Sequence, residues 1–122
     1  MKIYYSHPKS YKNSEEGAED ISLLTALGYE VVSPYDPKFS DLWQSEGISF
    51  GKVLVEMCGA FAVRPLSTGK ISAGAGKELN WAIEAGKLIL EMPSASPFDL
   101  SSLDGRVLSI DDTVEFFKTV GK

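Results

Sequence analysis

Short apolar runs alternate with segments of helical periodicity along the chain, and this alternation limits the possible folds more than any other feature. The expected strands are Lys2–Ser6, Tyr29–Ser33, Ala60–Arg64, Leu88–Met92 and Arg106–Ile110. Strands that alternate with helices form a parallel sheet with right-handed crossovers and helices on both faces. The sequence therefore predicts an α/β fold, a single doubly wound, Rossmann-like (flavodoxin-like) domain over residues 1–122 with a five-stranded parallel sheet.

The segments between the strands contain helix start and stop signals. Ser14, followed by two acids, is expected to cap the first helix, and Gly28 is expected to end it. The stretch 41–58 has a helical pattern, but Gly47 and Gly51 weaken it and are candidate break points. The remaining expected helices are Lys77–Ala85, after a loop that runs to Gly76, and a last one capped by Asp111.

Charge and hydropathy exclude some classes of partner. The formal net charge of −5 argues against nucleic acid, which normally requires a basic face. No apolar run approaches the roughly 20 residues of a membrane span. The first residues lead straight into polar ones, so no cleavable signal peptide is expected and the predicted location is cytoplasmic. Cys58, the sole cysteine, is expected to be a buried apolar residue.

A glycine-rich turn, Ser72–Glu78, joins an expected strand to an expected helix. Gly74 and Gly76 let the backbone approach a ligand, and a helix start supplies unpaired N–H groups and partial positive charge. An anion fits there, with Ser72 adding a hydroxyl, and the same field is expected to keep Glu78, in the first helical turn, ionised. A positioned carboxylate is what a nucleophile at a sugar carbon requires. The alternative is a plain loop whose glutamate merely favours the helix dipole.

Residues of the first strand are expected at the same rim, because ligands of such sheets bind beyond the carboxyl ends of the strands. Tyr4 and Tyr5 face opposite sides of the sheet, so one of them can reach Glu78; the alternative is two core aromatics. His7, the sole histidine, follows this strand. It is a candidate contact to a phosphate or a base, or else a surface loop residue.

Acidic, basic and aromatic side chains lie on the neighbouring segments. Asp36, Asp41 and Glu46 are candidate contacts to sugar hydroxyls or a base, with a solvated acidic loop as the alternative. The cations that bracket the glycine turn, and are expected to screen an anion, are Arg64, Lys70 and Lys77. Trp43 and Trp81 are candidates for stacking on a base or for packing in the core.

Together these segments resemble the nucleoside 2-deoxyribosyltransferase superfamily over nearly the whole chain. The resemblance lies in Ile3–Tyr5, Gly28–Pro34, Ser72–Leu79, Ala82 and Gly86–Lys87. It implies a small doubly wound domain that cleaves an N-glycosidic bond. It also implies that Glu78 is the catalytic nucleophile and that Tyr4 positions it.

The residue six positions before the nucleophile differs between branches of this superfamily. Enzymes that act on free nucleosides usually have an aspartate there, whereas the branch that hydrolyses nucleoside 5′-monophosphates has a serine followed by two glycines. Ser72, Gly74 and Gly76 are similar to the second pattern, which implies that they bind a 5′-phosphate, with Ser6 or His7 helping. A serine and bare amides suit a phosphate, whereas an aspartate would repel it.

The chain also departs from the family pattern. The acid that the family commonly has on the helix before the third strand falls near Gly51, with Glu46 as a substitute from an earlier turn. The glycine-rich first loop is replaced by His7–Ser10. The resemblance implies a homodimer with shared active sites, in which Ser94–Ser102 is the expected donor loop. No organic cofactor is implied, and one histidine with one cysteine predicts no transition-metal site.

Three functions are compatible with these features. The first is hydrolysis of a (deoxy)nucleoside 5′-monophosphate through a glycosyl–enzyme intermediate on Glu78. The second is transfer of the sugar to another base by a deoxyribosyltransferase. The third is a nucleotide-binding or sensor domain without catalysis, which the altered first loop and Gly51 would favour.

Overall fold

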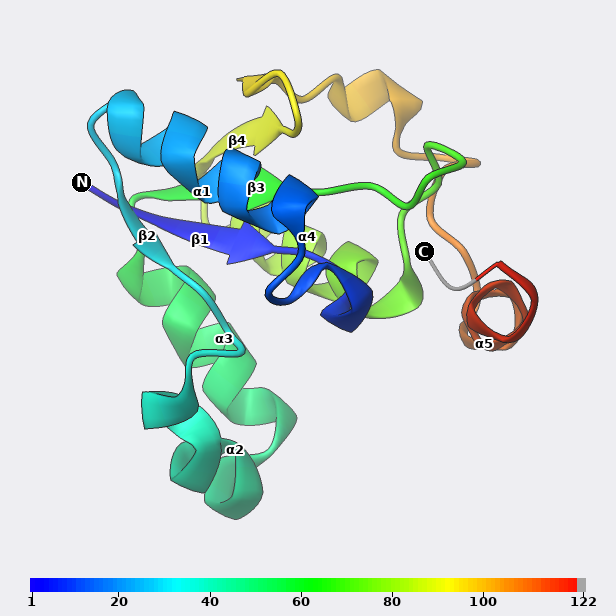
Figure 1. Ribbon diagram of the computed structural model, residues 1–122, viewed down its shortest axis with the longest axis horizontal. Coiled ribbons are helices and arrows are strands. Elements are labelled where there is room, and N and C mark those ends of the chain that lie inside the picture. The colour runs from blue at the N-terminus through cyan, green and yellow to red at the C-terminus, as the bar shows by residue number, and fades with distance from the viewer. Residues whose placement is uncertain (121–122) are drawn as a thin grey trace.

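A sheet lies between two helical layers in the computed structural model, which describes residues 1–120 (Figure 1). Within these residues the sheet has five strands in the order β2-β1-β3-β4-β5. The strands are β1 (Lys2–Ser6), β2 (Glu30–Val32), β3 (Ala60–Val63), β4 (Leu88–Glu91) and β5 (Ser96–Pro97). The α-helices are α1 (Glu15–Ala26), α2 (Ser40–Glu46), α3 (Ile48–Met57), α4 (Ala73–Glu84) and α5 (Ile110–Thr119). Three short 3₁₀ turns are η1 (Lys9–Tyr11), η2 (Pro37–Phe39) and η3 (Leu100–Ser102).

The predicted parallel sheet with helices on both faces is confirmed for β1 to β4, which pair in parallel. Strand alternation sends Ile3 and Tyr5 toward Leu24 of α1 on one face. On the other face Tyr4 packs in a core that includes Leu54 of α3 and Leu79 of α4. The interior strand β1 therefore belongs to both cores.

The fifth strand differs from the one that the sequence predicts. Ser96–Pro97 pairs antiparallel with β4 and takes its free edge, where a proline is tolerated at a strand without a further neighbour. The expected strand Arg106–Ile110 forms only one bridge, between Val107 and Ile71, outside the named strands. Its β-branched residues favoured a strand, but the edge of the sheet is already occupied.

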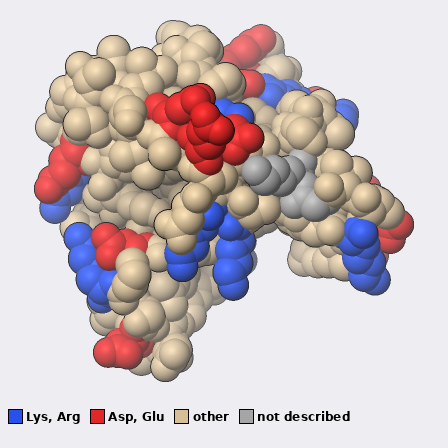
Figure 2. All heavy atoms as spheres, viewed as in Figure 1, with Lys and Arg blue, Asp and Glu red and all other residues tan. Residues whose placement is uncertain are grey.

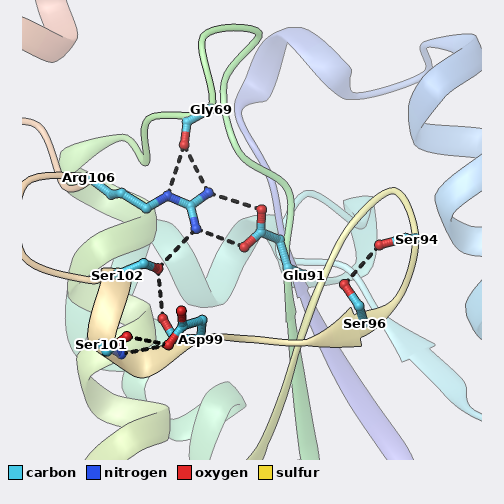
Figure 3. A network of polar contacts seen from close by, with 8 residues as sticks. All are labelled: Gly69, Glu91, Ser94, Ser96, Asp99, Ser101, Ser102 and Arg106. Carbon is cyan, nitrogen blue, oxygen red and sulfur yellow. Dashed lines mark hydrogen bonds and ion pairs between the residues drawn. The ribbon is translucent and has the colours of Figure 1, made fainter.

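Arg106 anchors this segment instead (Figure 3). Its guanidinium donates to both carboxylate oxygens of Glu91 at 2.8 and 3.0 Å, a bidentate pairing with the last residue of β4. It also donates to the carbonyl of Gly69 at 2.9 Å and to Ser102 Oγ at 3.3 Å. This network holds the chain that leads into α5 against the end of β4.

Helix α4 begins four residues earlier than expected, at Ala73. Ser72 is its N-cap and accepts a hydrogen bond from the amide of Ala75, so the glycines belong to the first helical turn and not to a loop. A Cβ atom on Gly76 would lie 2.5 Å from Val107 Cγ1, whereas one on Gly74 would have no neighbour within 4 Å. Gly76 is therefore required for packing between α4 and the segment before α5.

Two other helix boundaries are settled by local conformation. The stretch 41–58 breaks at Gly47, whose positive φ of 60° an L side chain rarely adopts, while Gly51 lies inside α3. The last helix is capped by Ser109, which accepts from the amide of Asp112, and not by Asp111. No helix within residues 1–120 is long and apolar enough to cross a bilayer.

Charged side chains are unevenly distributed on the face shown in Figure 2. Acidic groups gather over α1, and basic groups lie beside them over the segment that joins β1 to α1. This segment contains the exposed Lys9 and Lys12. A positive patch therefore borders the carboxyl end of β1.

Gly74 and Gly76, in the first turn of α4, provide a matched pair for testing the packing of this helix against Val107. We expect Gly76→Ala to lower the free energy of unfolding by about 1–3 kcal/mol, because an inserted methyl overpacks the contact with Val107. Gly74→Ala is expected to be neutral or to stabilise by about 0.5–1 kcal/mol, because alanine favours helices. Urea unfolding measures both, and equal effects of the two substitutions would contradict the packing role of Gly76.

Candidate functional site

Two hydroxyls of β1 converge on the carboxylate of Glu78. Tyr4 OH donates a hydrogen bond to Oε2, and Ser6 Oγ donates to Oε1 at 2.9 Å. Both donors are completely buried, since Tyr4 and Ser6 are 0% exposed. Each carboxylate oxygen therefore has one fixed hydrogen bond and keeps further acceptor capacity.

Glu78 lies in the second turn of α4 and not in the first, because the helix begins at Ala73. The expected effect of the helix field on its charge is therefore replaced by two opposing influences. Burial raises the pKa of Glu78 above its usual range, while the hydrogen bonds from Tyr4 and Ser6 oppose this rise. Burial is the larger influence, so the ionised carboxylate is poorly solvated and depends on these two donors.

A cleft of about 430 Å³ opens in front of this carboxylate, and we call it the central cleft. One wall is the segment 7–10 after β1 together with Tyr35, and another is the face of α4 that contains Gly74, Glu78 and Trp81. The remaining lining residues belong to three other helices and are Trp43, Ile48, Gly51, Thr113 and Phe117.

A second hollow of about 650 Å³, the side cleft, adjoins the central cleft and shares Tyr35, Trp43 and Glu78 with it. Asp36 lines the side cleft, where its carboxylate accepts from the amide of Lys38 and also pairs with the Lys38 ammonium at 3.8 Å. The structure thus brings Asp36 to the edge of the site. Glu46 is exposed on α2 and lines neither cleft.

The residues predicted to bind phosphate separate into two groups. Ser72, Gly74 and His7 line the central cleft. Ser6 does not line this cleft and donates its hydrogen bond to Glu78, and Gly76 packs against Val107. The sequence pattern could not distinguish a glycine that lines a cleft from one that permits close packing.

Not all of the first N–H groups of α4 have a hydrogen-bond partner. Ala73 N–H donates to Thr113 Oγ1 at 3.0 Å, and Ala75 N–H donates to the capping Ser72 Oγ at 3.3 Å. Within residues 1–120, the amide of Gly74 has no hydrogen-bond partner, and Gly74 is exposed at the cleft. One N–H of the helix start is therefore available to an anion.

Two of the three cations expected to screen that anion are used elsewhere. Arg64 points to the other face of the sheet and pairs with the buried Asp20 at 3.0 Å. Lys70 Nζ donates to the carbonyl of Gly105 at 2.7 Å. Lys77 does line the central cleft, as does Lys9, which the sequence patterns did not single out.

His7 is buried between two aromatic rings. Its imidazole stacks on Tyr5 with centroids 4.3 Å apart and meets Tyr35 edge to face at 5.0 Å. Burial lowers the pKa of His7, although the hydrogen bond to the carbonyl of Tyr5 at 3.1 Å opposes this change. Because that carbonyl accepts, the proton lies on Nδ1, and Nε2 of the neutral ring is an acceptor that does not suit a phosphate dianion.

Ser10 is a site residue that the sequence patterns missed. It lines the central cleft from η1, and within residues 1–120 its buried Oγ has no hydrogen-bond partner. An unsatisfied buried hydroxyl is costly unless a ligand or water completes it. No spacing rule identifies such a residue, because the fold of the segment after β1 alone brings it to the cleft.

No group of three histidine, cysteine, aspartate or glutamate side chains in residues 1–120 is placed to hold a metal ion.

The raised pKa of Glu78 has a consequence for stability. A carboxyl whose pKa is higher in the folded state binds protons more tightly there, so its cost to folding grows as the pH rises from the usual carboxyl range through the folded pKa. We expect Glu78→Gln to stabilise the protein at neutral pH by about 0.5–2 kcal/mol, the common range for single stabilising substitutions.

Urea unfolding of both proteins between acidic and neutral pH measures this difference. The gain is expected to shrink as the pH falls below the usual carboxyl range, where Glu78 is protonated in both states. A gain that grows toward acid would show that hydrogen bonding, and not burial, dominates.

Comparisons with known proteins agree with this fold. The sequence matches no protein-family model and no curated protein. Among solved structures, the chain is similar to the CMP N-glycosidase BcmB of Clostridium botulinum, with 18% sequence identity and a TM-score of 0.52. The similarity covers 75% of this chain and 70% of that one. The chain therefore shares the α/β fold of an N-glycosidase, in agreement with the resemblance seen in its sequence.

Proposed function

We propose that this protein hydrolyses the N-glycosidic bond of a (deoxy)nucleoside 5′-monophosphate, releasing the base and the sugar 5-phosphate. The observation that supports it most is the buried pairing of Glu78 with Tyr4 and Ser6 at the carboxyl end of β1. The structural similarity to a CMP N-glycosidase supports the same type of reaction.

Glu78 is the proposed nucleophile. One carboxylate oxygen attacks C1′ of the sugar, and the C1′–N bond breaks as its electron pair leaves with the base. Water then attacks C1′ of the resulting ester from the other side, giving its proton to solvent and restoring the carboxylate. The two displacements retain the configuration at C1′.

Tyr4 and Ser6 are the proposed positioning residues. Their hydroxyls fix both carboxylate oxygens and offset the burial that raises the pKa of Glu78. Burial also raises the pKa of Tyr4 far above that of a free phenol, so Tyr4 remains a hydrogen-bond donor at every relevant pH. Ser6 is thereby reassigned from the phosphate to the nucleophile.

The 5′-phosphate is proposed to bind at the first turn of α4. Ser72 and Gly74, whose amide is free, line the cleft there, and Ser10 offers an unpaired hydroxyl. Lys9 and Lys77 supply positive charge at the rim. His7, held neutral by burial, is proposed to contact the sugar or the base.

The structure places Asp36 beside the site but not Glu46. Asp36 is proposed to contact the sugar hydroxyls from the side cleft, whereas Glu46 reaches neither cleft and has no proposed role. The homodimer stays part of the proposal, because apolar side chains on α3 and α5, such as Val53 and Val114, are exposed at 54% and 48%. Sedimentation equilibrium at the mass of one chain, 13.3 kDa, would remove it.

Base release from ribo- and deoxyribonucleoside 5′-monophosphates and the matching free nucleosides, followed by chromatography, tests the function. We expect release from monophosphates only, and loss of at least about 10³-fold in Glu78→Ala, because the nucleophile is removed. Glu84→Ala, exposed on the same helix and outside both clefts, is the control. Formation of a new nucleotide when a second base is added would instead show a transferase.

Substitutions of Tyr4 and Tyr5 distinguish a role in positioning Glu78 from a role in folding. Tyr4→Phe is expected to lower kcat about 10²-fold, because a misplaced nucleophile loses its attack geometry. Tyr5→Phe removes the equivalent hydroxyl on the other face, where it donates to Asp20, and is expected to leave kcat unchanged. Equal kcat values for the two variants would contradict the role of Tyr4.

Substitution of Ser10 tests the proposed phosphate site and is not expected to change the stability of the protein without ligand. Ser10→Ala removes a hydroxyl that has no partner within residues 1–120, so no loss of stability is expected. KM for a monophosphate is expected to rise about 10- to 150-fold, the range for a hydrogen bond to a charged group. Thermal unfolding and steady-state kinetics measure both, and an unchanged KM would remove Ser10 from the phosphate site.

A further inference from the structure

The central cleft runs along one face of α4, and its lining changes character along that helix. Ser72 and Gly74 lie at its start, Glu78 follows four residues after Gly74, and Trp81 follows three residues later. At 1.5 Å per residue these steps are about 6 Å and about 4.5 Å. This order matches the order of phosphate, C1′ and base in a nucleoside 5′-monophosphate.

Two tryptophans meet over a residue without a side chain at the Trp81 end of the cleft. A Cβ atom on Gly51 would lie 3.0 Å from Cη2 of Trp43 and 3.5 Å from Cζ3 of Trp81. The six-membered rings of both indoles therefore converge above Gly51 of α3. Any larger residue at this position would occupy the space that the rings share.

The indoles offer aromatic surface, and the N–H of Trp43 is already used within the protein. Trp43 donates its Nε1 proton to the carbonyl of Pro34 at 2.7 Å and packs edge to face on Phe50 at 5.1 Å, which fixes its ring. The ammonium of Lys77 lies 5.9 Å from the ring centroid of Trp81. Both rings line the cleft and are only partly buried.

Within residues 1–120, the central cleft has no carboxamide side chain that could pair with the edge of a base, and Gln44 and Asp36 line the adjoining side cleft instead. Among its lining residues in the described part of the chain, Glu78 is the only carboxylate, and none has a carboxamide. Carboxamides and carboxylates are the groups that pair with the amino and ring-nitrogen edges of adenine and cytosine. Stacking on an aromatic face, in contrast, is available to every base.

We propose that Trp43 and Trp81 bind the base of the substrate by stacking. Gly51 makes this possible, because its lack of a side chain leaves room for both indole rings at this end of the cleft. This proposal rests on the nucleotide hydrolase function above and extends it to the class of base. The protein selects its substrate by the phosphate and by the area of the heterocycle, and not by the hydrogen-bonding pattern of the base. Purine and pyrimidine 5′-monophosphates both bind, and purines bind more tightly.

Intrinsic fluorescence reports this contact directly, because Trp43 and Trp81 are the two tryptophans of the sequence. The variant Glu78→Gln, which is expected to bind without turnover, is titrated with AMP, GMP, CMP, UMP and ribose 5-phosphate. Each nucleotide is expected to quench the fluorescence and to bind about 5- to 150-fold more tightly than ribose 5-phosphate, the range for one stacked base. Bases of equal size are expected to differ by less than about 10²-fold.

Substitutions then assign the effect to the three residues. In Trp81→Leu the nucleotides are expected to lose their advantage over ribose 5-phosphate, while Trp81→Phe keeps part of it. Gly51→Ala is expected to weaken nucleotides and not ribose 5-phosphate, because the new methyl displaces the ring of Trp43. Calorimetric titration of ribose 5-phosphate shows that each variant still folds and binds.

The outcomes separate this proposal from the proposed function. Equal affinities for nucleotides and ribose 5-phosphate, or an unchanged nucleotide affinity in Trp81→Leu, would overturn the stacking proposal and leave the hydrolase intact. A preference of about 10⁴-fold between bases of equal size would also overturn it, since only hydrogen-bonded recognition is so selective. Absence of binding by any nucleotide and by ribose 5-phosphate would overturn the hydrolase function, and the stacking proposal with it.

Discussion

The alternation of side chains along the interior strand β1 is the constraint on which the rest of the structure depends. Tyr4 and Tyr5 point to opposite faces, and each donates its hydroxyl to a carboxylate on a helix. Tyr4 meets Glu78 of α4, and Tyr5 meets Asp20 of α1, which Arg64 also pairs at 3.0 Å. One strand thus fixes both helical layers through buried hydrogen bonds.

The two carboxylates differ in the charges beside them. Asp20 is 2% exposed and has a guanidinium beside it, so its charge is compensated within the fold. Glu78 has hydroxyl donors but no cation paired with it among residues 1–120, and it opens onto a cleft. A buried carboxylate without a paired cation next to an open cleft is a candidate for a functional group, which agrees with the role proposed for Glu78.

The sequence predicted what depends on periodicity. The strands β1 to β4, the first helix with its Ser14 cap and the opposite orientation of Tyr4 and Tyr5 follow from local patterns. It could not predict β5, because a two-residue edge strand has no periodicity and depends on β4 alone. The sequence patterns also assigned Gly76 and Ser6 to a ligand and did not indicate Ser10. Whether such a residue lines a cleft or packs against another side chain depends on tertiary contacts, which local patterns do not contain.

The contact between Gly76 and Val107 also bears on how such chains can diverge. These positions are far apart in sequence, yet a Cβ at the first would collide with the side chain of the second. The backbone of Val107 is held by the bridge to Ile71 and by the neighbouring Arg106, so the segment cannot easily move away from α4. A related chain with a side chain at position 76 is therefore expected to have a smaller one at position 107, and the two positions should covary in evolution.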